Sequence, residues 1–308
     1  MRLAHLRCLL SCLGAAALLL VSIARSSAWG GDAVPTFRFR LAVSAGMMGP
    51  GVNEGDARLA MQAWRDAVVR QSGFLVDFHV STLPNLVREL RDHQLDGFTL
   101  TTLEFLDVQN YAGPSLLMDE SYLSGGDEYL LLVNEDSNLR TLADLRHKSL
   151  NVYDNPRMCL AANWLQSLLA SSKLGTSEEF FGRPSSLSKL SKVVLPVYFR
   201  QIDACLVTRR GFSTMCELNP QLGRKLRVLA SSPKLITTFM AFHKDTPTSA
   251  RQRCEAALVG LHKSVAGQQA LTLFESSRLV LTDISVLRTT LDLVKTHDRA
   301  RGNSAGRN

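Results

Sequence analysis

The chain has 308 residues, 45% of them hydrophobic and 20% charged, a balance that excludes an intrinsically disordered protein. The 280 residues that follow residue 28 (308 minus 28) are enough for two domains. The formal net charge of +7 comes largely from the two ends of the chain, and the sequence has no Lys/Arg-dense helix with interleaved aromatic residues, which argues against nucleic-acid binding.

The first residues have the three parts of a secretory signal. Arg2 and Arg7 give a basic start, the stretch 8–24 is almost continuously apolar, and small residues lead up to Ala28. We therefore predict that residues 1–28 are a cleaved signal peptide and that the mature protein is periplasmic. A membrane anchor is the alternative, but the apolar run is at the short limit for a transmembrane span.

The segment after the signal alternates strands and helices. Strands are predicted at 37–44, 74–80 and 95–100, and helices at 56–72, at 83–93 and from Leu103 onward, with a Gly-rich loop at 46–55. The first helix has apolar residues at helical spacing and stops at Gly73. This repeat predicts a parallel sheet whose loops gather at the carboxyl ends of its strands.

A second unit follows the fully apolar stretch 129–133. Strands are predicted at 149–153, 193–198, 204–207 and 226–229, and helices at 141–145, at 155–171 and from Phe212 onward. A strand-like stretch at 236–242 comes next, and the two final helices, at 249–266 and 268–276, have no sheet of their own. We therefore expect them to return to the first unit.

The predicted fold class is α/β, with two Rossmann-like lobes joined by two crossing hinge strands. Lobe 1 is expected to comprise residues 29–130 and 239–295, lobe 2 residues 131–238, and residues 296–308 a disordered polar tail. Two lobes joined in this way enclose a cleft, and interfaces between lobes favour ligands.

Six short segments carry a resemblance to a known family. They are SAGMMGPG from Ser44, LDGFTL from Leu95, YLLLV from Tyr129, LRTLADLRHKSLNVYD from Leu139, FRQIDACLVT from Phe199 and TTFMAFHKD from Thr237. In this order and spacing the chain resembles, over residues 36–280, the periplasmic phosphate/phosphonate-type solute-binding proteins of ABC transporters. The resemblance implies the type II periplasmic binding protein fold.

The resemblance also implies a function. We expect the substrate-binding component of an ABC-type importer, which captures a small anionic solute, phosphate/phosphonate-like or another oxyanion, between its lobes and is recognised by an ABC permease. A ligand-presenting subunit for a periplasmic sensor is the alternative. A periplasmic enzyme on the same scaffold is a remote one, because the sequence has no nucleophile elbow, no HExxH and no paired acid and base. We expect no enzyme, no cofactor, no metal, a monomer, and membrane contact only through the partner.

Two helix starts are the candidates for holding the anion. Thr101 and Glu104 have the spacing of a capping box, and Thr102 with the N–H groups of that helix start would hold an oxyanion. A well-capped helix without a ligand explains the same residues. Across the cleft, Asn155 is predicted to cap a helix whose first turn contains Arg157, which would form a bidentate pair with a phosphoryl or carboxylate group. A solvated surface arginine is the alternative.

The chain departs from phosphonate-type members at one place, and from amino-acid binders of the same fold at another. Phosphonate-type members usually have a hydroxyl-rich loop where this chain has residues 154–159 (DNPRMC). In amino-acid binders of the fold, the position near Thr208 is commonly acidic and holds the ligand amine. Thr208 and Arg209 do not fit that role, so an amino-acid ligand is disfavoured.

The remaining candidates are side chains that the topology places near the cleft. They are Ser44, Met47 and Met48 in the first strand-to-helix loop, and Tyr122 and Tyr153, each able to supply a hydroxyl and a stacking face. Ordinary core packing is the alternative for the methionines and tyrosines. The carboxylates of Asp119 and Asp127 are interpreted as solvated loop charges.

The mature chain keeps four cysteines: Cys159, Cys205, Cys216 and Cys254. An even number in an oxidising compartment permits disulfides without assigning them. A bond from Cys254 to any of the others would tie the lobes together and oppose closure. We expect at most one disulfide, within lobe 2, with Cys205–Cys216 slightly favoured.

Overall fold

The structure is a computed structural model that describes residues 38–49, 62, 64–70, 73–124, 126–273 and 276–294. The predicted signal peptide, the polar tail and most of the predicted Gly-rich loop lie outside the described residues. Within the described part of the chain, no helix is long and apolar enough to span a membrane.

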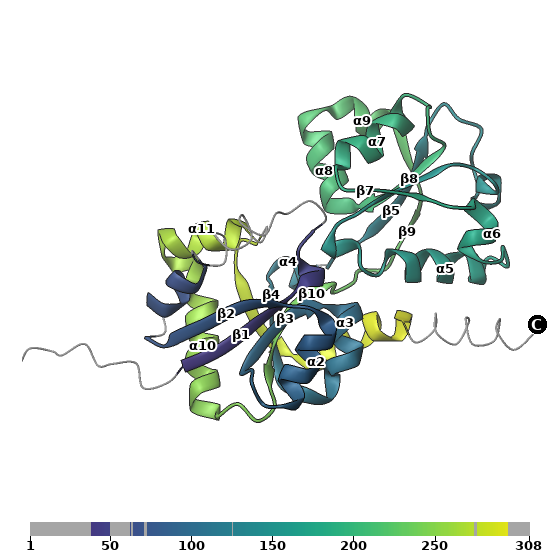
Figure 1. The fold of residues 1–308 in the computed structure, drawn as a ribbon. Coiled ribbons are helices and arrows are strands. Elements are labelled where there is room, and N and C mark those ends of the chain that lie inside the picture. The colour runs from purple at the N-terminus through teal and green to yellow at the C-terminus, as the bar shows by residue number, and fades with distance from the viewer. Residues whose placement is uncertain are drawn as a thin grey trace, which may run out of the picture. The chain divides into compact units, whose positions relative to one another are not determined.

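The first sheet contains six strands in the order β11-β4-β10-β3-β1-β2 (Figure 1). Strand β1 pairs in parallel with β2 and β3, whereas β10 pairs antiparallel with β3 and β4, and β11 antiparallel with β4. The bounds are β1 Arg38–Ser44, β2 Leu75–Ser81, β3 Gly97–Thr101, β4 Ala112–Asp119, β10 Thr238–His243 and β11 Leu279–Asp283.

Helices cover both faces of this sheet. On one face α10 (Thr248–Gly260) and α11 (Val265–Leu273) pack against Phe39 and Leu41 of β1. On the other face α2 (Leu83–Arg91) and α3 (Thr102–Val108) pack against a cluster that includes Ala42. Successive β1 side chains thus contribute to opposite cores, as the two-residue period of a strand requires. Shorter elements complete this part: η1 Ala45–Met47, η2 Gln109–Tyr111, α4 Ser121–Ser124, η5 Leu261–Lys263 and η6 Ile284–Leu287.

The second sheet contains five strands in the order β7-β6-β8-β5-β9. Strand β6 pairs in parallel with β7 and β8, and β5 pairs antiparallel with β8 and β9. The strands are β5 Tyr129–Asn134, β6 Leu150–Tyr153, β7 Ser185–Leu187, β8 Ala204–Thr208 and β9 Leu226–Ser231, and the helices are η3 Leu142–Leu145, η4 Pro156–Met158, α5 Ala161–Ser171, α6 Ser177–Phe181, α7 Leu190–Tyr198, α8 Arg209–Leu218 and α9 Pro220–Lys225.

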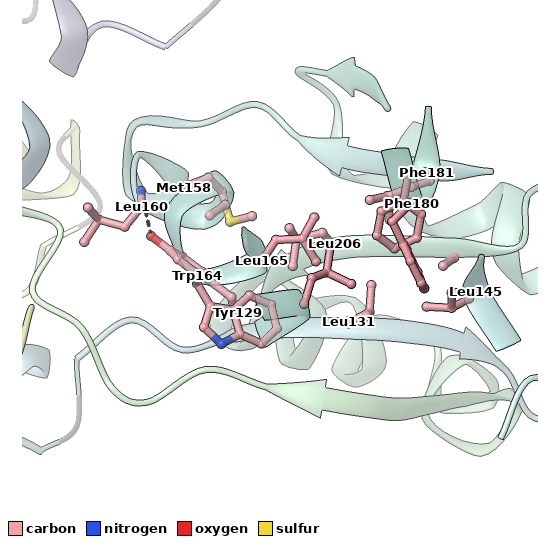
Figure 2. Packing of buried hydrophobic residues seen from close by; sticks show 14 of the residues in the cluster. Tyr129, Leu131, Leu145, Met158, Leu160, Trp164, Leu165, Phe180, Phe181 and Leu206 are labelled. Atoms are coloured by element: carbon pink, nitrogen blue, oxygen red, sulfur yellow. Dashed lines mark hydrogen bonds between the residues drawn. The ribbon is translucent and has the colours of Figure 1, made fainter. Parts of the chain in front are cut away.

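Strand β5 is buried along its whole length because both faces of the second sheet are covered. Leu131 faces a cluster with Trp164 and Leu165 of α5 and Phe180 of α6 (Figure 2). Leu130 and Leu132 face the opposite cluster, which contains residues of α7, α8 and α9. The uninterrupted apolar sequence of β5 is therefore explained by two cores that share one strand.

The chain passes between the sheets twice, before β5 (residues 126–128) and before β10 (residues 232–237), and we call these stretches the passing segments. The two passing segments pair through one antiparallel bridge between Asp127 and Leu235, whose backbone hydrogen bonds measure 2.7 and 2.8 Å. Gly126 next to the bridge has φ +73°, and a Cβ atom there would lie 2.6 Å from the Leu235 carbonyl oxygen. Glycine is therefore required at this position.

The predicted fold class is confirmed: both sheets are mixed α/β layers, and the chain returns to the first sheet through β10. The predicted strand at 193–198 is wrong, because these residues belong to helix α7. Val193, Val194 and Val197 are all buried and lie on one helical face. Strands β4, β7 and β11 were not predicted.

Of the at most one disulfide expected, the slightly favoured Cys205–Cys216 bond is not formed, and Cys159, Cys205, Cys216 and Cys254 are all free thiols. The position of the Cys216 sulfur explains the absence of this bond. The sulfur points toward helix α9, where a Cβ atom on Gly223 would lie 3.5 Å from it, whereas Cys205 is fully buried in strand β8.

Candidate functional site

A buried ion pair lies where the segment after β6 meets the passing segments. Arg157 belongs to η4, whose start is capped by Asn155: its Oδ1 accepts a hydrogen bond of 2.9 Å from the Arg157 amide. The Arg157 Nη1 atom lies 3.3 Å from Oδ1 of Asp127, and the two side chains are only 11% and 4% exposed. The alternative of a solvated surface arginine is therefore wrong.

Tyr122 and two threonines complete this polar cluster. The Tyr122 hydroxyl donates to Asp127 Oδ2 at 2.9 Å, and it lies 2.7 Å from the Thr237 hydroxyl and 3.1 Å from that of Thr238. The Thr237 hydroxyl also donates to Asp127 Oδ2. Burial, and secondly the charge of Asp127, raise the pKa of Tyr122 far above its ordinary value, so its hydroxyl stays protonated at neutral pH.

The guanidinium of Arg157 also stacks on Tyr122. Its Cζ atom lies 5.5 Å from the centroid of the Tyr122 ring, and its Nη1 donates to the hydroxyl at 3.3 Å. The planar guanidinium thus has a carboxylate on one side and an aromatic face on another, which fixes its orientation. Tyr122, predicted as a site residue, therefore positions Arg157.

The backbone of η4 is held by Tyr129 at the start of β5. The Tyr129 hydroxyl donates to the Arg157 carbonyl at 2.8 Å and accepts from the Leu160 amide at 3.3 Å, a bond drawn in Figure 2. The Cys159 thiol donates to the carbonyl of Thr237 at 3.5 Å. Both passing segments are therefore bonded to the turn that presents Arg157.

A cavity of about 100 Å³ lies against Arg157 and the edge of the first sheet. Asp119 is the last residue of β4. Thr238, the first residue of the antiparallel β10, pairs with Thr101, the last residue of β3. The cavity therefore lies at the carboxyl ends of β3 and β4. The polar lining residues are Thr99, Asp119, Arg157, Thr238 and Ser276, and the remaining lining residues are apolar: Val43, Met47, Trp64, Phe78, Leu117, Met118, Phe239, Met240, Leu271 and Leu279.

Asp119 is the second buried carboxylate of the site. It is 7% exposed, and its Oδ1 accepts a 2.8 Å hydrogen bond from the Ser121 amide. Its Oδ2 atom is buried without a hydrogen-bond partner. Burial by itself would raise the pKa of Asp119, but hydrogen bonding by Ser121 and Ser276, and then the positive charge of Arg157, hold it below the ordinary value. Asp119 is therefore ionised at neutral pH.

The donors predicted at the start of α3 are engaged by the protein itself. The Thr101 hydroxyl and Glu104 form the predicted capping box, and Ser44 donates to the second oxygen of Glu104. The Thr102 amide donates to the Thr237 carbonyl at 2.8 Å, and its hydroxyl donates to the Ile236 carbonyl at 2.5 Å. The carboxylate of Glu104 therefore lies where an oxyanion was expected.

The other predicted residues fall into two groups. Met47 lines the cavity, whereas Met48 ends η1 as its C-cap and is not a lining residue. Tyr153 accepts a 3.2 Å hydrogen bond from the Asn155 amide group, and the Thr208 hydroxyl caps α8 by accepting from the Gly211 amide at 3.1 Å. Tyr153 and Thr208 thus have local structural partners.

The interpretation of Asp119 and Asp127 as solvated loop charges is wrong, since both are buried in the site. One signal could have identified Asp119: it directly follows the apolar run Leu116-Leu117-Met118, where a strand would end. Asp127 had no comparable signal, because its burial depends on Arg157 and Thr237, which are distant in sequence.

One group of side chains has atoms at metal-ligand spacing. His93, His243 and Asp245 bring one ligand atom each within 4.8 Å of one another, at the opposite end of β10 from Thr238. Local bonds account for this arrangement: His93 and Asp245 pair at 3.4 Å, and the Asp245 amide donates to His243 Nδ1 at 3.2 Å.

Comparison with solved structures gives several proteins of the same fold. A binding protein component of an ABC phosphonate transporter from Pseudomonas aeruginosa has a TM-score of 0.58 at 14% identity, over 85% of this chain and 87% of that one. PhnD1 from Prochlorococcus marinus, in complex with methylphosphonate, has a TM-score of 0.59 at 12% identity, over 85% and 98%. A Xanthomonas citri protein bound to ATP has a TM-score of 0.61 at 17% identity, over 86% and 98%.

The family assignment rests on sequence. Among curated proteins, no sequence match is found. The family model described as "ABC transporter, phosphonate, periplasmic substrate-binding protein" matches residues 48–287, which is well over half of the chain and includes Asp119, Asp127 and Arg157. The chain therefore belongs to the family of periplasmic substrate-binding proteins of phosphonate ABC transporters.

Proposed function

We propose that this protein binds a small phosphonate-like oxyanion in the cavity beside Arg157. The observation that carries the proposal is the position of this guanidinium, which lines the cavity while Asp127 and Tyr122 hold it in place. A planar guanidinium fixed in this way can donate two charge-assisted hydrogen bonds to a phosphonyl group. Methylphosphonate, the ligand of the Prochlorococcus marinus protein, belongs to this chemical class.

In this proposal the ligand set differs from the one expected from sequence. Arg157 and Met47 line the cavity and are retained, and Thr238, which also lines it, is added. Thr101 and Thr102 are dropped as ligand donors because their polar groups bond to Glu104 and to the passing segment. Asn155 acts indirectly, since it caps the turn that carries Arg157.

Ligand binding would be coupled to hinge motion. We propose lobes with the predicted boundaries, 29–130 plus 239–295 and 131–238, which rotate about the two passing segments. Asp127 and Thr237 lie in these segments, and both bond to the turn of Arg157 and Cys159. A ligand held by Arg157 would therefore act directly on the hinge, the mechanism by which domain closure follows ligand capture.

The protein would deliver its ligand to the permease of an ABC transporter and would have no catalytic activity of its own. A monomer, export through the signal peptide and periplasmic localisation complete the proposal. No feature of the described residues favours a sensor domain over a permease as the partner.

Calorimetric titration and small-angle scattering test this function together. Methylphosphonate is expected to bind and to reduce the radius of gyration, and inorganic phosphate serves as the competing simple oxyanion. Arg209→Ala is the matched control for Arg157→Ala, because Arg209 forms an exposed pair with Glu128 outside the cavity lining. Failure of both methylphosphonate and inorganic phosphate to bind the wild type would overturn the proposal.

A further inference from the structure

The last described segment of the chain, residues 284–294, is helical and lies beside α3 (Figure 1). It begins as η6 and continues as a helix to Val294. Its buried residues Leu287, Thr290 and Val294 recur at helical spacing, so they lie on one face. We call residues 284–294 the C-terminal strap. The strap therefore presents a buried face to the rest of the protein.

The two ends of the strap enter different cores. Leu287 belongs to the cluster that contains Phe239 of the first sheet. Val294 belongs instead to the cluster that contains Trp164 of α5 and Leu235 of the second passing segment. A segment anchored at both ends in this way restricts the movement of the passing segment that lies between the two cores.

Thr290 bonds to this passing segment directly. Its hydroxyl oxygen accepts a hydrogen bond of 3.1 Å from the Ile236 amide, and Thr290 is only 1% exposed. Next to this bond, Val286 and Thr289 of the strap and Lys234 of the passing segment line a hollow of about 450 Å³. Side-chain packing between the two segments is therefore incomplete here, and the hydrogen bond is a principal link between them.

Ile236 directly precedes a residue that holds the ion pair of the site. The Thr237 hydroxyl donates to Asp127 Oδ2, and its carbonyl accepts a hydrogen bond of 3.5 Å from the Cys159 thiol. Asp127 in turn lies 3.3 Å from the Nη1 atom of Arg157. A shift of Ile236 would therefore move the donor that orients Asp127, and with it the guanidinium that lines the cavity.

We propose that Thr290 is a positioning residue for ligand capture: through Ile236 it fixes the passing segment that orients Arg157. The inference rests on the proposed function, which places the oxyanion at Arg157. When the passing segment is loosened, it must be ordered again on binding, which costs free energy and lowers the affinity. The strap thus acts on the site from a distance, since none of the described lining residues of the cavity belongs to it.

Calorimetric titration with methylphosphonate tests Thr290. Thr290→Val removes the acceptor with little change of shape and leaves the buried Ile236 amide without it. We expect binding roughly 3-fold to 30-fold weaker than in the wild type, mainly through faster dissociation. Thr290→Ser keeps the hydroxyl and should recover most of the affinity. Thr289→Val makes the same change at the exposed neighbouring residue and should bind like the wild type.

A variant of similar stability separates positioning from general destabilisation. Val193→Ala removes buried methyl groups of α7 in the core of the second sheet. It should lower the melting temperature by several degrees and leave the affinity unchanged well below that temperature. Thr290→Val should weaken binding even where its melting temperature matches that of Val193→Ala. Equal affinity in Thr290→Val and the wild type would overturn the positioning role.

Val294→Ala tests the other anchor of the strap. It removes side-chain contacts with the core of the second sheet but leaves the bond between Thr290 and Ile236 in place. We expect it to weaken methylphosphonate binding in the same direction as Thr290→Val. This variant also tests the strap if Thr290→Val does not fold. An unchanged affinity in Val294→Ala would overturn the anchoring role of the second core.

A measurement without ligand separates this inference from the proposed function. Thr290→Val and Asp127→Asn, joined through Ile236 and Thr237, should have non-additive effects on the free energy of unfolding. Additive effects would overturn the link between Thr290 and the ion pair. If neither methylphosphonate nor inorganic phosphate binds the wild type, the proposed function fails and the effect on affinity fails with it. If the wild type binds methylphosphonate and Thr290→Val binds it equally well, the function stands and only the role of Thr290 is overturned.

Discussion

Asp127 and Leu235 pair through two backbone hydrogen bonds, of 2.7 and 2.8 Å, at the point where the chain passes between its two sheets. The same Asp127 contributes its side chain to the buried pair with Arg157. One residue therefore joins the backbone of the two passing segments to the cation that lines the cavity. A change in the charge beside Arg157 would act on the segments about which the lobes are proposed to rotate.

Removal of Arg157 should affect both binding and stability. Arg157→Ala should weaken phosphonate binding roughly 10-fold to 100-fold, because two charge-assisted hydrogen bonds are lost. It should also lower the free energy of unfolding by roughly 3–5 kcal/mol, because Asp127 is left buried without its cation. Removal of a solvated surface arginine, by contrast, would change stability by less than about 0.5 kcal/mol. Arg157→Lys should recover part of both losses.

Denaturant unfolding of a double-mutant cycle measures this coupling. The double variant with Arg157→Met and Asp127→Asn should lose less unfolding free energy than the sum of the two single variants, and the difference should be at least about 1 kcal/mol. Arg209→Ala breaks a pair in which the arginine is 49% exposed, so it should cost less than about 1 kcal/mol. Additive effects of Arg157→Met and Asp127→Asn would contradict the buried pair.

Gly126 should be the less replaceable of two glycines with similar positive φ angles. Gly126 and Gly182 have φ of +73° and +71°, but a Cβ atom at Gly126 would lie 2.6 Å from the Leu235 carbonyl oxygen, whereas nothing lies within 4 Å at Gly182. Both alanine variants incur the cost of a backbone conformation that residues with a Cβ atom rarely adopt, about 1–3 kcal/mol. Only Gly126→Ala also disturbs the bridge between the passing segments, so its melting temperature should fall further. Equal melting temperatures would argue against a tight bridge.

The sequence predicts the alternating strands and helices of both sheets, because their apolar residues follow the period of each element. It fails for β4, since Gly113 and Pro114 interrupt the strand and Pro cannot donate to a sheet ladder. The pairing of β4 with β10 is irregular in this part and becomes regular only from Leu116 onward. Missing β4 hid Asp119, which this strand brings to the cavity.

Helix α7 shows a second limit of prediction from sequence. Residues 193–198 include three valines, whose β-branched side chains favour a strand, and Pro196, which is unfavourable inside a helix. Their fit to the second sheet as a helix depends on contacts with Leu130, Leu132 and Cys205, which no local pattern reveals. Arg157 illustrates the same limit: its helix start and Asn155 cap were predicted, but its pairing with Asp127 is a tertiary contact.

The four cysteines should titrate as free thiols in denatured, non-reduced protein. In the native state Cys216 should react first with an alkylating reagent at pH 8. Burial raises the pKa of Cys159 to about 12 and that of Cys205 and Cys254 well above their ordinary value, and a protonated thiol is a poor nucleophile. Mass spectrometry after timed labelling identifies the residue modified. Two free thiols in the denatured protein, with Cys205 and Cys216 protected, would restore the disulfide.

His243 should make the protein less stable in weak acid. Burial of the ring, opposed by the charge of Asp245 and reinforced by that of His93, lowers the pKa of His243 below its ordinary 6.5. The Asp245 amide donates to Nδ1 at 3.2 Å, a bond that requires this nitrogen to be unprotonated. Because the unfolded chain then binds a proton more readily than the folded one, stability is complete above pH 6.5 and decreases as the pH falls below it.

Urea unfolding between pH 5 and 7.5 measures the effect. His243→Gln should flatten the profile below pH 6.5, whereas His79→Gln, which replaces a ring that is 46% exposed, should keep the wild-type slope. If His243→Gln lost stability toward acid as steeply as the wild type, the acid sensitivity would have to come from another group.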